Sequence, residues 1–118
     1  MRFVLVILLL IAPIEAGRAA PAAMGGPGAA SCAEFAQAYK SNPVAAGNFY
    51  FAWAQGYISG LNSIALQTNQ QFIDLAAMSF PDQQMFIRQY CDQHPLAAYV
   101  QGVLDLIERL PKRSPQSN

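Results

Sequence analysis

The most regular alternation of apolar and polar positions lies toward the C-terminal end of the chain. Apolar side chains recur there at the spacing of one helix face, at Leu96, Tyr99 or Val100, Val103, Ile107 and Leu110. His94-Pro95 breaks the preceding helix, proline suits a first turn, and Pro111 cannot continue a helix. The pattern therefore predicts a helix that starts at Pro95, packs one side against a core and ends at Pro111.

A second apolar pattern runs from about Asn48, a good N-cap residue, to about Ala65. Its polar residues Gln55, Ser59 and Asn62 form one narrow stripe, and apolar side chains cover the rest of the circumference. A helix that is apolar around most of its surface belongs in the interior of a bundle. We therefore expect this helix to lie in the middle of the fold.

Two glycines interrupt that helix, in the segment Gly56-Tyr-Ile-Ser-Gly60. Phosphate-binding loops need glycines after a strand, and a membrane helix pair needs a longer apolar span than this one. Gly56 and Gly60 share a face with Phe49 and Trp53, and glycine inside a helix costs about 1 kcal/mol relative to alanine. We expect both glycines to contact the first or fourth helix closely, with Trp53 filling the space one turn earlier, so that Gly60→Leu would be strongly destabilising.

Two further helices have clear start signals. Ser31 and Glu34 have the spacing of a capping box, and the helix that they open ends near residues 41–43. Ser79 is a candidate cap for a helix that runs to about Gln93. Residues 66–79 predict either one or two helical turns or an ordered loop, and no long strand pattern is present. The sequence predicts an all-α domain of four helices over residues 31–111.

The chain ends have different compositions from the domain. Arg2 precedes an apolar run that stops at Pro13, which is typical of a signal peptide over residues 1–19 with cleavage after Ala16 or Ala19. An uncleaved anchor is the alternative. Residues 20–30, rich in Ala, Gly and Pro, predict a flexible linker, and residues 112–118 a disordered tail.

The sequence contains 2 cysteines, Cys32 and Cys91. Because the N-terminal signal places them in an oxidising compartment, we expect one disulfide between the first and third helices. The alternatives are a redox-active pair, which is usually closer in sequence, and lipidation of Cys32, which would leave Cys91 unpaired.

Charged residues are few and balanced from Ser31 onward, with six acidic and five basic side chains. No basic cluster outside the tail would attract nucleic acid. Ser59, Asp74 and His94 are the residue types of a hydrolase triad, but no nucleophile motif accompanies them. One histidine with two cysteines lacks the spacing of a zinc site. We therefore predict no enzyme, no cofactor and no metal.

The chain resembles a group of small exported alphaproteobacterial helical proteins in three features. They are the cysteine that opens the first helix, the segment "WAQGYISGLN" and the segment "RQYCDQHPL". That group is similar to the HdeA/HdeB-type periplasmic acid-stress chaperones and, more distantly, to Rap-type immunity proteins that neutralise type VI secretion effectors. The resemblance covers about residues 31–111. It implies an HdeA-like orthogonal bundle and a periplasmic location.

The leading functional hypothesis is an exported protein, periplasmic or secreted, that acts by binding another protein. We rank general interaction above acid-stress chaperone, because the domain has only six carboxylates, and both above an immunity protein. The aromatic residues Phe49, Tyr50 and Tyr57 are the candidate interface, and a homodimer is left open. The contrasting hypothesis is a small-ligand carrier or hydrolase with its pocket near Trp53, Tyr57 and His94.

Overall fold

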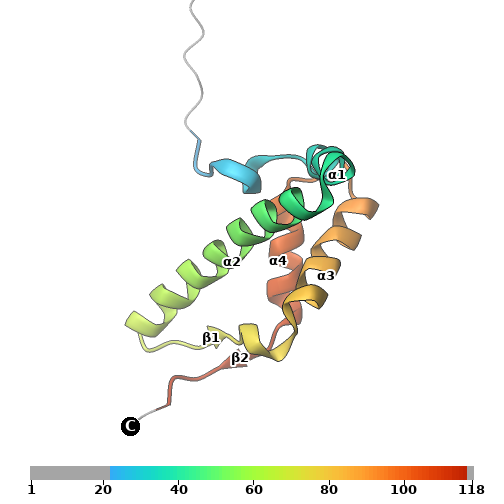
Figure 1. Ribbon diagram of the computed structural model, residues 1–118. Helices are drawn as coiled ribbons and strands as arrows, with labels where there is room; N and C mark the ends of the chain where they lie inside the picture. The colour runs from blue at the N-terminus through green and yellow to red at the C-terminus, as the bar shows by residue number, and fades with distance from the viewer. Residues whose placement is uncertain (1–21, 117–118) are drawn as a thin grey trace, which may run out of the picture.

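A computed structural model describes residues 22–116, which fold into four α-helices with short connecting elements (Figure 1). In chain order the elements are η1 (Gly26–Ala29), α1 (Cys32–Ser41), α2 (Pro43–Gln67), β1 (Phe72–Ile73), η2 (Leu75–Ala77), α3 (Phe80–Gln93), α4 (Tyr99–Arg109) and β2 (Lys112–Arg113). The all-α, four-helix class is confirmed. The HdeA-like orthogonal arrangement stays a prediction, and the signal peptide over residues 1–19 lies outside the described residues.

Local capping chemistry sets the starts of α1 and α3. The Ser31 hydroxyl accepts a hydrogen bond from the Glu34 amide at 3.2 Å, and the Glu34 carboxylate accepts one from the Ser31 amide at 2.7 Å. At α3 the Ser79 hydroxyl accepts a hydrogen bond from the Asp82 amide and donates one to the Asp82 carboxylate. Both sequence-predicted starts are confirmed, because N-caps act within one turn of the chain.

The start of α2 differs from the prediction. The helix begins at Pro43 rather than near Asn48, because the Asn42 side-chain oxygen accepts a hydrogen bond from the Ala45 amide at 3.1 Å. Pro43 then occupies the first turn, where its missing N–H is harmless. Asn48 is an exposed residue inside the helix rather than its cap.

The start of α4 also differs from the prediction. The helix begins at Tyr99, and Leu96 is 94% exposed in the preceding turn rather than on the apolar face. The reason is a competing set of hydrogen bonds: the amides of Cys32 and Ala33 donate to the carbonyls of Ala97 and Pro95 at 2.8 and 3.0 Å. These bonds hold the α3–α4 connection in a non-helical conformation against the start of α1.

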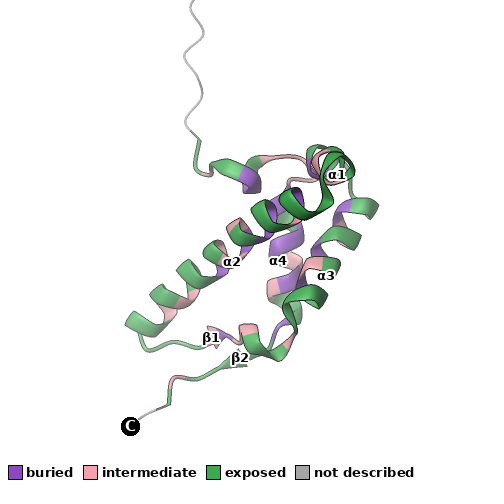
Figure 2. Ribbon diagram, viewed as in Figure 1, coloured by how far each residue is buried: buried purple, intermediate pink, exposed green. Residues whose placement is uncertain are grey.

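The helices α3 and α4 pack side by side, whereas α2 diverges from α4 toward its C-terminal end (Figure 1). The pairing of β1 with β2 lies at that end of the molecule. Ile58 is the last buried residue of α2, although the helix continues to Gln67 (Figure 2). The prediction that α2 lies in the middle of the bundle is therefore wrong for its C-terminal third, which lies at the surface.

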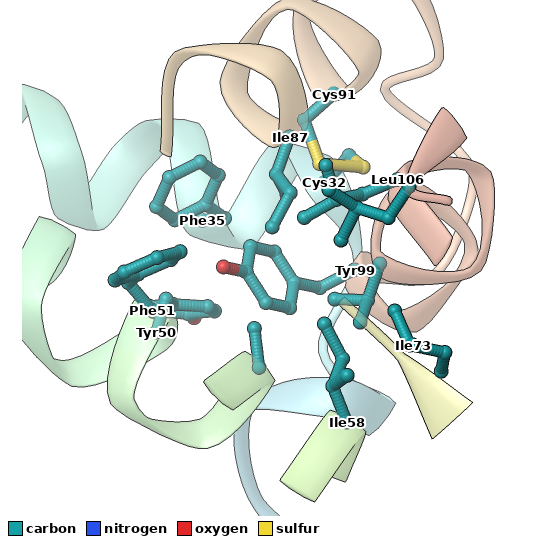
Figure 3. Close-up of a cluster of buried hydrophobic side chains, with 13 residues drawn as sticks. Cys32, Phe35, Tyr50, Phe51, Ile58, Ile73, Ile87, Cys91, Tyr99 and Leu106 are labelled. Atoms are coloured by element: carbon teal, nitrogen blue, oxygen red, sulfur yellow. A yellow bond between two sulfur atoms is a disulfide. The ribbon is translucent and has the colours of Figure 1, made fainter. Parts of the chain in front are cut away.

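Tyr99 lies at the centre of the core (Figure 3). Its ring centroid is 5.1 Å from that of Phe35 on α1 and 5.0 Å from that of Tyr50 on α2. Ile87 on α3 and Leu106 on α4 complete the surroundings as buried residues of the same cluster. One aromatic side chain thus joins the four helices around a single core.

The segments on either side of the helices are more ordered than the sequence predicts. The linker prediction is wrong for Gly26–Ala29, which form η1 and bury Pro27 and Gly28. The tail prediction is wrong for Lys112–Arg113, which form β2 and pair with Phe72–Ile73. The folded unit therefore extends beyond residues 31–111 at both ends.

Candidate functional site

The predicted disulfide is present. Cys32 is the first residue of α1, Cys91 lies in the last turn of α3, and their sulfur atoms are bonded. Both residues are buried in the core cluster (Figure 3). The bond joins two helices through residues 59 positions apart in the sequence.

The predicted close packing at Gly56 and Gly60 is wrong. Both glycines are exposed, and a Cβ built at either position would meet no atom within 4 Å. The close helix contact is made instead by Gly102 on α4, where a Cβ would lie 3.0 Å from the Tyr90 ring of α3. The close glycine contact therefore lies on α4 and not, as predicted, on α2.

Trp53 packs as predicted, but against a different neighbour. Its ring lies against η1, where a Cβ at Gly28 would be 2.0 Å from the Trp53 ring. It also stacks on Tyr57 with ring centroids 5.3 Å apart. Since η1 lies in the segment predicted to be a linker, this contact was not anticipated.

The three candidate interface residues have three different environments. Phe49 is exposed, Tyr57 is half-buried, and Tyr50 is buried in the core beside Phe35 and Tyr99. Tyr50 is therefore not available to a partner, and the prediction is wrong for this residue. Burial in the core and the nearby Glu34 carboxylate raise the pKa of Tyr50.

One apolar side of α2 continues past the end of the core. Ala54 is buried and Tyr57 is half-buried, whereas Leu61 is 38% and Ile64 is 62% exposed. Their spacing of three and four residues places them on one side of the helix. We call Tyr57, Leu61 and Ile64 the α2 ridge. Between Lys40 and Asp74 the chain contains no Asp, Glu, Lys, Arg or His, so no charged side chain of α2 flanks the ridge.

Asp74 and His94 make other contacts in the described part of the chain, and Ser59 faces solvent. The Asp74 carboxylate accepts hydrogen bonds from the Arg113 guanidinium at 2.8 Å and from the Ala76 amide at 3.0 Å. His94 stacks on Tyr90, and its Nδ1 lies 2.9 Å from the Tyr90 carbonyl oxygen. Ser59 is exposed on α2. No hydrogen bond among residues 22–116 connects any two members of this set.

A cavity of about 460 Å³ lies between α1, the N-terminal half of α2, and α3. Its lining residues are Phe35, Tyr39, Pro43, Val44, Gly47, Asn48, Phe51, Pro81, Gln84, Met85, Arg88 and Tyr99. Small-molecule pockets commonly have volumes of about 300–1,000 Å³ and mostly apolar walls with a few polar groups. The pocket that we predict near Trp53, Tyr57 and His94 is thus in the wrong place, because none of these three residues lines the cavity.

Arg88 is the cationic residue that lines this cavity. Its guanidinium carbon lies 3.7 Å from the centroid of the Tyr39 ring, a cation–π geometry. Its Nε is 4.0 Å from the nearest Asp92 carboxylate oxygen, beyond hydrogen-bond distance. Arg88 also lines a second cavity of about 360 Å³, together with Lys40 and Asp92. The two cavities therefore share Arg88, and the second one also contains one further cationic side chain and one carboxylate.

Tyr99 reaches the same cavity from the core. The residue is only 1% exposed, and its hydroxyl points toward Phe35, Tyr50 and Phe51 (Figure 3). Among the described residues, every fully buried polar side-chain atom has a hydrogen-bond partner, yet no protein group bonds to this hydroxyl. The hydroxyl is therefore an atom that solvent reaches, through the cavity that Tyr99 lines. Burial, with a smaller effect of Tyr50, strongly raises its pKa, so it remains a donor.

Arg88 and Tyr99 are not among the site residues predicted from the sequence. Tyr99 fits the apolar face of α4, and Arg88 resembles an ordinary surface charge of an amphipathic helix. The one available signal is that Arg88 is the sole cation between Lys40 and Arg109. Its relation to Tyr39 depends on how α1 and α3 cross, which no local pattern encodes.

Within residues 22–116, no helix combines the length and the hydropathy that crossing a membrane requires. In the same part of the chain, no three His, Cys, Asp or Glu side chains gather in a way that could hold a metal ion. Comparisons of the chain with models of protein families, with curated proteins and with solved structures found no match.

Proposed function

We propose that this protein is exported to the periplasm or secreted, and that it acts without catalysis by binding another protein at the α2 ridge. The N-terminal sequence pattern and the Cys32–Cys91 disulfide support export, because disulfides persist in oxidising compartments. The resemblance to small exported helical proteins agrees with this assignment. The partner itself is defined only by the surface that it would cover.

The observation that carries the proposal is the uncovered apolar side of α2. Leu61 and Ile64 continue the side of the helix on which Tyr50 and Ala54 are buried, yet they face solvent. Full burial of such a side chain contributes about 1.5–3 kcal/mol, and covering the exposed fractions of Leu61 and Ile64 contributes the corresponding part of it. A partner that covers the ridge would gain this energy without having to neutralise a charged side chain of α2.

The test is site-specific photo-crosslinking in the cells that export the protein. A benzophenone amino acid replaces Ile64 on the ridge or, as a matched control, Leu96, which is also an exposed aliphatic side chain but lies on the α3–α4 connection. We expect a discrete adduct from position 64 and none from position 96. Absence of an adduct at position 64, or equal adducts at both positions, would overturn the proposal.

The identity of the crosslinked protein distinguishes a homodimer, a dedicated partner and a chaperone. A product with twice the mass of the chain identifies a homodimer, and one heterologous protein identifies a dedicated partner, as an immunity protein would have. Many different proteins, captured more strongly in acid, identify a chaperone. Leu61→Asp should abolish each of these adducts, because it places a carboxylate at the centre of the ridge.

A further inference from the structure

We propose that the cavity between α1, α2 and α3 binds a small aromatic monocarboxylate that carries a hydrogen-bonding group at the end opposite its carboxylate. Arg88 would bind the carboxylate, Tyr99 would donate to the opposite group, and the rings of Phe35 and Phe51 would pack against the aromatic body. This site does not depend on the α2 ridge. Asn48, which lines the cavity, and Leu61 are 13 residues apart on one helix, which corresponds to about 20 Å.

The polar groups of the cavity lack protein partners. Four polar side chains line the cavity without making a hydrogen bond within the described part of the chain. They are Asn48, Gln84, Arg88 and Tyr99. Tyr99 matters most among them, because a tyrosine that is 99% buried normally has a partner for its hydroxyl. A ligand group at the cavity floor would supply that partner.

The charged side chains near Arg88 favour a single negative charge on the ligand. Arg88 is the charged residue that lines the cavity itself, and with Lys40 and Asp92, which line the second cavity beside it, the group carries one net positive charge. The guanidinium is stacked on Tyr39 and contacts Asp92 only at 4.0 Å through Nε, which leaves its terminal nitrogens for a ligand. A planar guanidinium matches a carboxylate through two parallel hydrogen bonds. A phosphate dianion would exceed the available positive charge and would lie near Asp92.

The separation of the two polar groups favours an aromatic body between them. Arg88 stacks on Tyr39, the Tyr39 and Phe35 ring centroids are 5.9 Å apart, and the Phe35 and Tyr99 centroids are 5.1 Å apart. A row of aromatic rings therefore separates the guanidinium from Tyr99. Rings pack well edge-to-face against such a wall, so a ligand with one ring between two polar ends fits this arrangement.

Three probes that share one skeleton test the proposal by NMR titration of the oxidised full chain. They are para-hydroxyphenylpropanoate, phenylpropanoate, which lacks the hydroxyl, and para-hydroxyphenylpropanamide, which lacks the charge. We expect the first to bind saturably and to shift the amide signals of Phe35, Arg88 and Tyr99. The uncharged amide should bind about tenfold more weakly, and phenylpropanoate several-fold more weakly.

Two conservative variants assign these differences to residues. In Arg88→Gln the acid and the amide should bind about equally well, so that the tenfold preference for the acid is lost. Tyr99→Phe should remove the preference for the hydroxylated acid. Arg109→Gln is the matched control, because Arg109 is also an arginine near an aromatic ring, at 5.9 Å from Phe86, but does not line the cavity. It should leave both preferences unchanged.

The outcomes that overturn the proposal are equally defined. They are the absence of saturable binding, shifts confined to residues outside the cavity, or preferences that persist in Arg88→Gln and Tyr99→Phe. Because the Tyr99 hydroxyl has no protein partner, Tyr99→Phe should keep the melting temperature of the parent. Failure of crosslinking at Ile64 would leave this result untouched, since the titration monitors a different part of the molecule.

Discussion

The side-chain amide nitrogen of Gln55 on α2 donates a 2.9 Å hydrogen bond to the side-chain oxygen of Gln83 on α3. Gln83 is fully buried, and its own amide nitrogen donates to the carbonyl oxygens of Leu75 and Met78 at 2.9 and 2.8 Å. One glutamine thus joins α2, α3 and η2 through a polar network in which each buried polar side-chain atom has a partner.

Gln83→Leu should destabilise the protein by about 3 kcal/mol, because it leaves two carbonyl oxygens and the Gln55 amide without their partner and each unpaired buried group costs about 1–3 kcal/mol. Urea unfolding measured by circular dichroism tests this value. Gln89→Leu, an exposed site on the same helix, should stay within about 0.5 kcal/mol of the parent. Equal effects of the two substitutions would contradict the role of the network.

Gly28→Ala should separate η1 from α2. The added methyl would lie 2.0 Å from the Trp53 ring, and overpacking of this kind costs about 1–3 kcal/mol. Because the sequence contains 1 tryptophan, its fluorescence reports this contact directly, and we expect a red shift as the ring becomes exposed. Gly25→Ala is the control, since its methyl would meet nothing within 4 Å. An unshifted spectrum for Gly28→Ala would show that the turn does not require glycine there.

Gly60→Ala should stabilise the protein, which reverses the expectation from the sequence. No neighbour lies within 4 Å of the added methyl, and alanine is favoured over glycine inside a helix by about 1 kcal/mol. Thermal unfolding should therefore show a higher midpoint. Gly102→Ala provides the opposite case, because its methyl would lie 3.0 Å from Tyr90. A lowered midpoint for Gly60→Ala would contradict the open space around Gly60.

Features that depend on neighbouring residues could be predicted from the sequence. The starts of α1 and α3 follow from Ser31 and Ser79, whose hydroxyls cap amides three residues away. The Cys32–Cys91 bond follows from a count of two cysteines, for which only one pairing exists, together with the signal-like N-terminal sequence pattern. The two caps depend only on residues within one helical turn, and the prediction of the disulfide depends only on the number of cysteines and on that N-terminal pattern.

Features that depend on how the helices cross could not be predicted. Gln55 and Asn62 belong to a polar stripe that suggests an outward face, yet Gln55 bonds to Gln83, and Asn62 bonds to both backbone groups of Ile73 at 2.7 and 2.8 Å. Gln83 is 28 residues from Gln55, and Ile73 is 11 residues from Asn62. The cavity at Arg88 has the same origin, because residues of four helices line it.

Cys32→Ala with Cys91→Ala should lower the free energy of unfolding by about 4 kcal/mol, because the bond closes a loop between residues 59 positions apart and removes that entropy from the unfolded chain. Urea unfolding of the double variant gives the value. The parent protein in reductant is the internal control and should approach the same midpoint. A midpoint unchanged by reductant would mean that the bond contributes nothing to stability.

The Asp74 carboxyl should make part of the free energy of unfolding depend on pH. The hydrogen bond from Arg113 is the main cause that lowers the pKa of this carboxyl below its ordinary value of 3.8, and the Ala76 amide contributes in the same direction. A carboxyl with a lowered pKa in the folded state stabilises the protein above the unfolded pKa, and this contribution is lost as the pH falls through the folded value. Asp74→Asn should therefore destabilise the protein near neutral pH, and the difference from the parent should disappear as the pH falls below the ordinary value of 3.8 and through the lowered folded pKa.

A double-mutant cycle isolates this pair from the rest of the molecule. Asp74→Asn, Arg113→Gln and the double variant should show a coupling near neutral pH, because Arg113 Nε donates to the Asp74 carboxylate at 2.8 Å. The same cycle in acid should show none, since the protonated carboxyl no longer attracts the guanidinium. The Glu34 carboxyl, whose pKa is lowered by hydrogen bonds from the Ser31 amide and hydroxyl, should behave in the same direction in Glu34→Gln. A coupling that is equal at both pH values would show that the interaction of Asp74 with Arg113 does not depend on the ionised carboxylate.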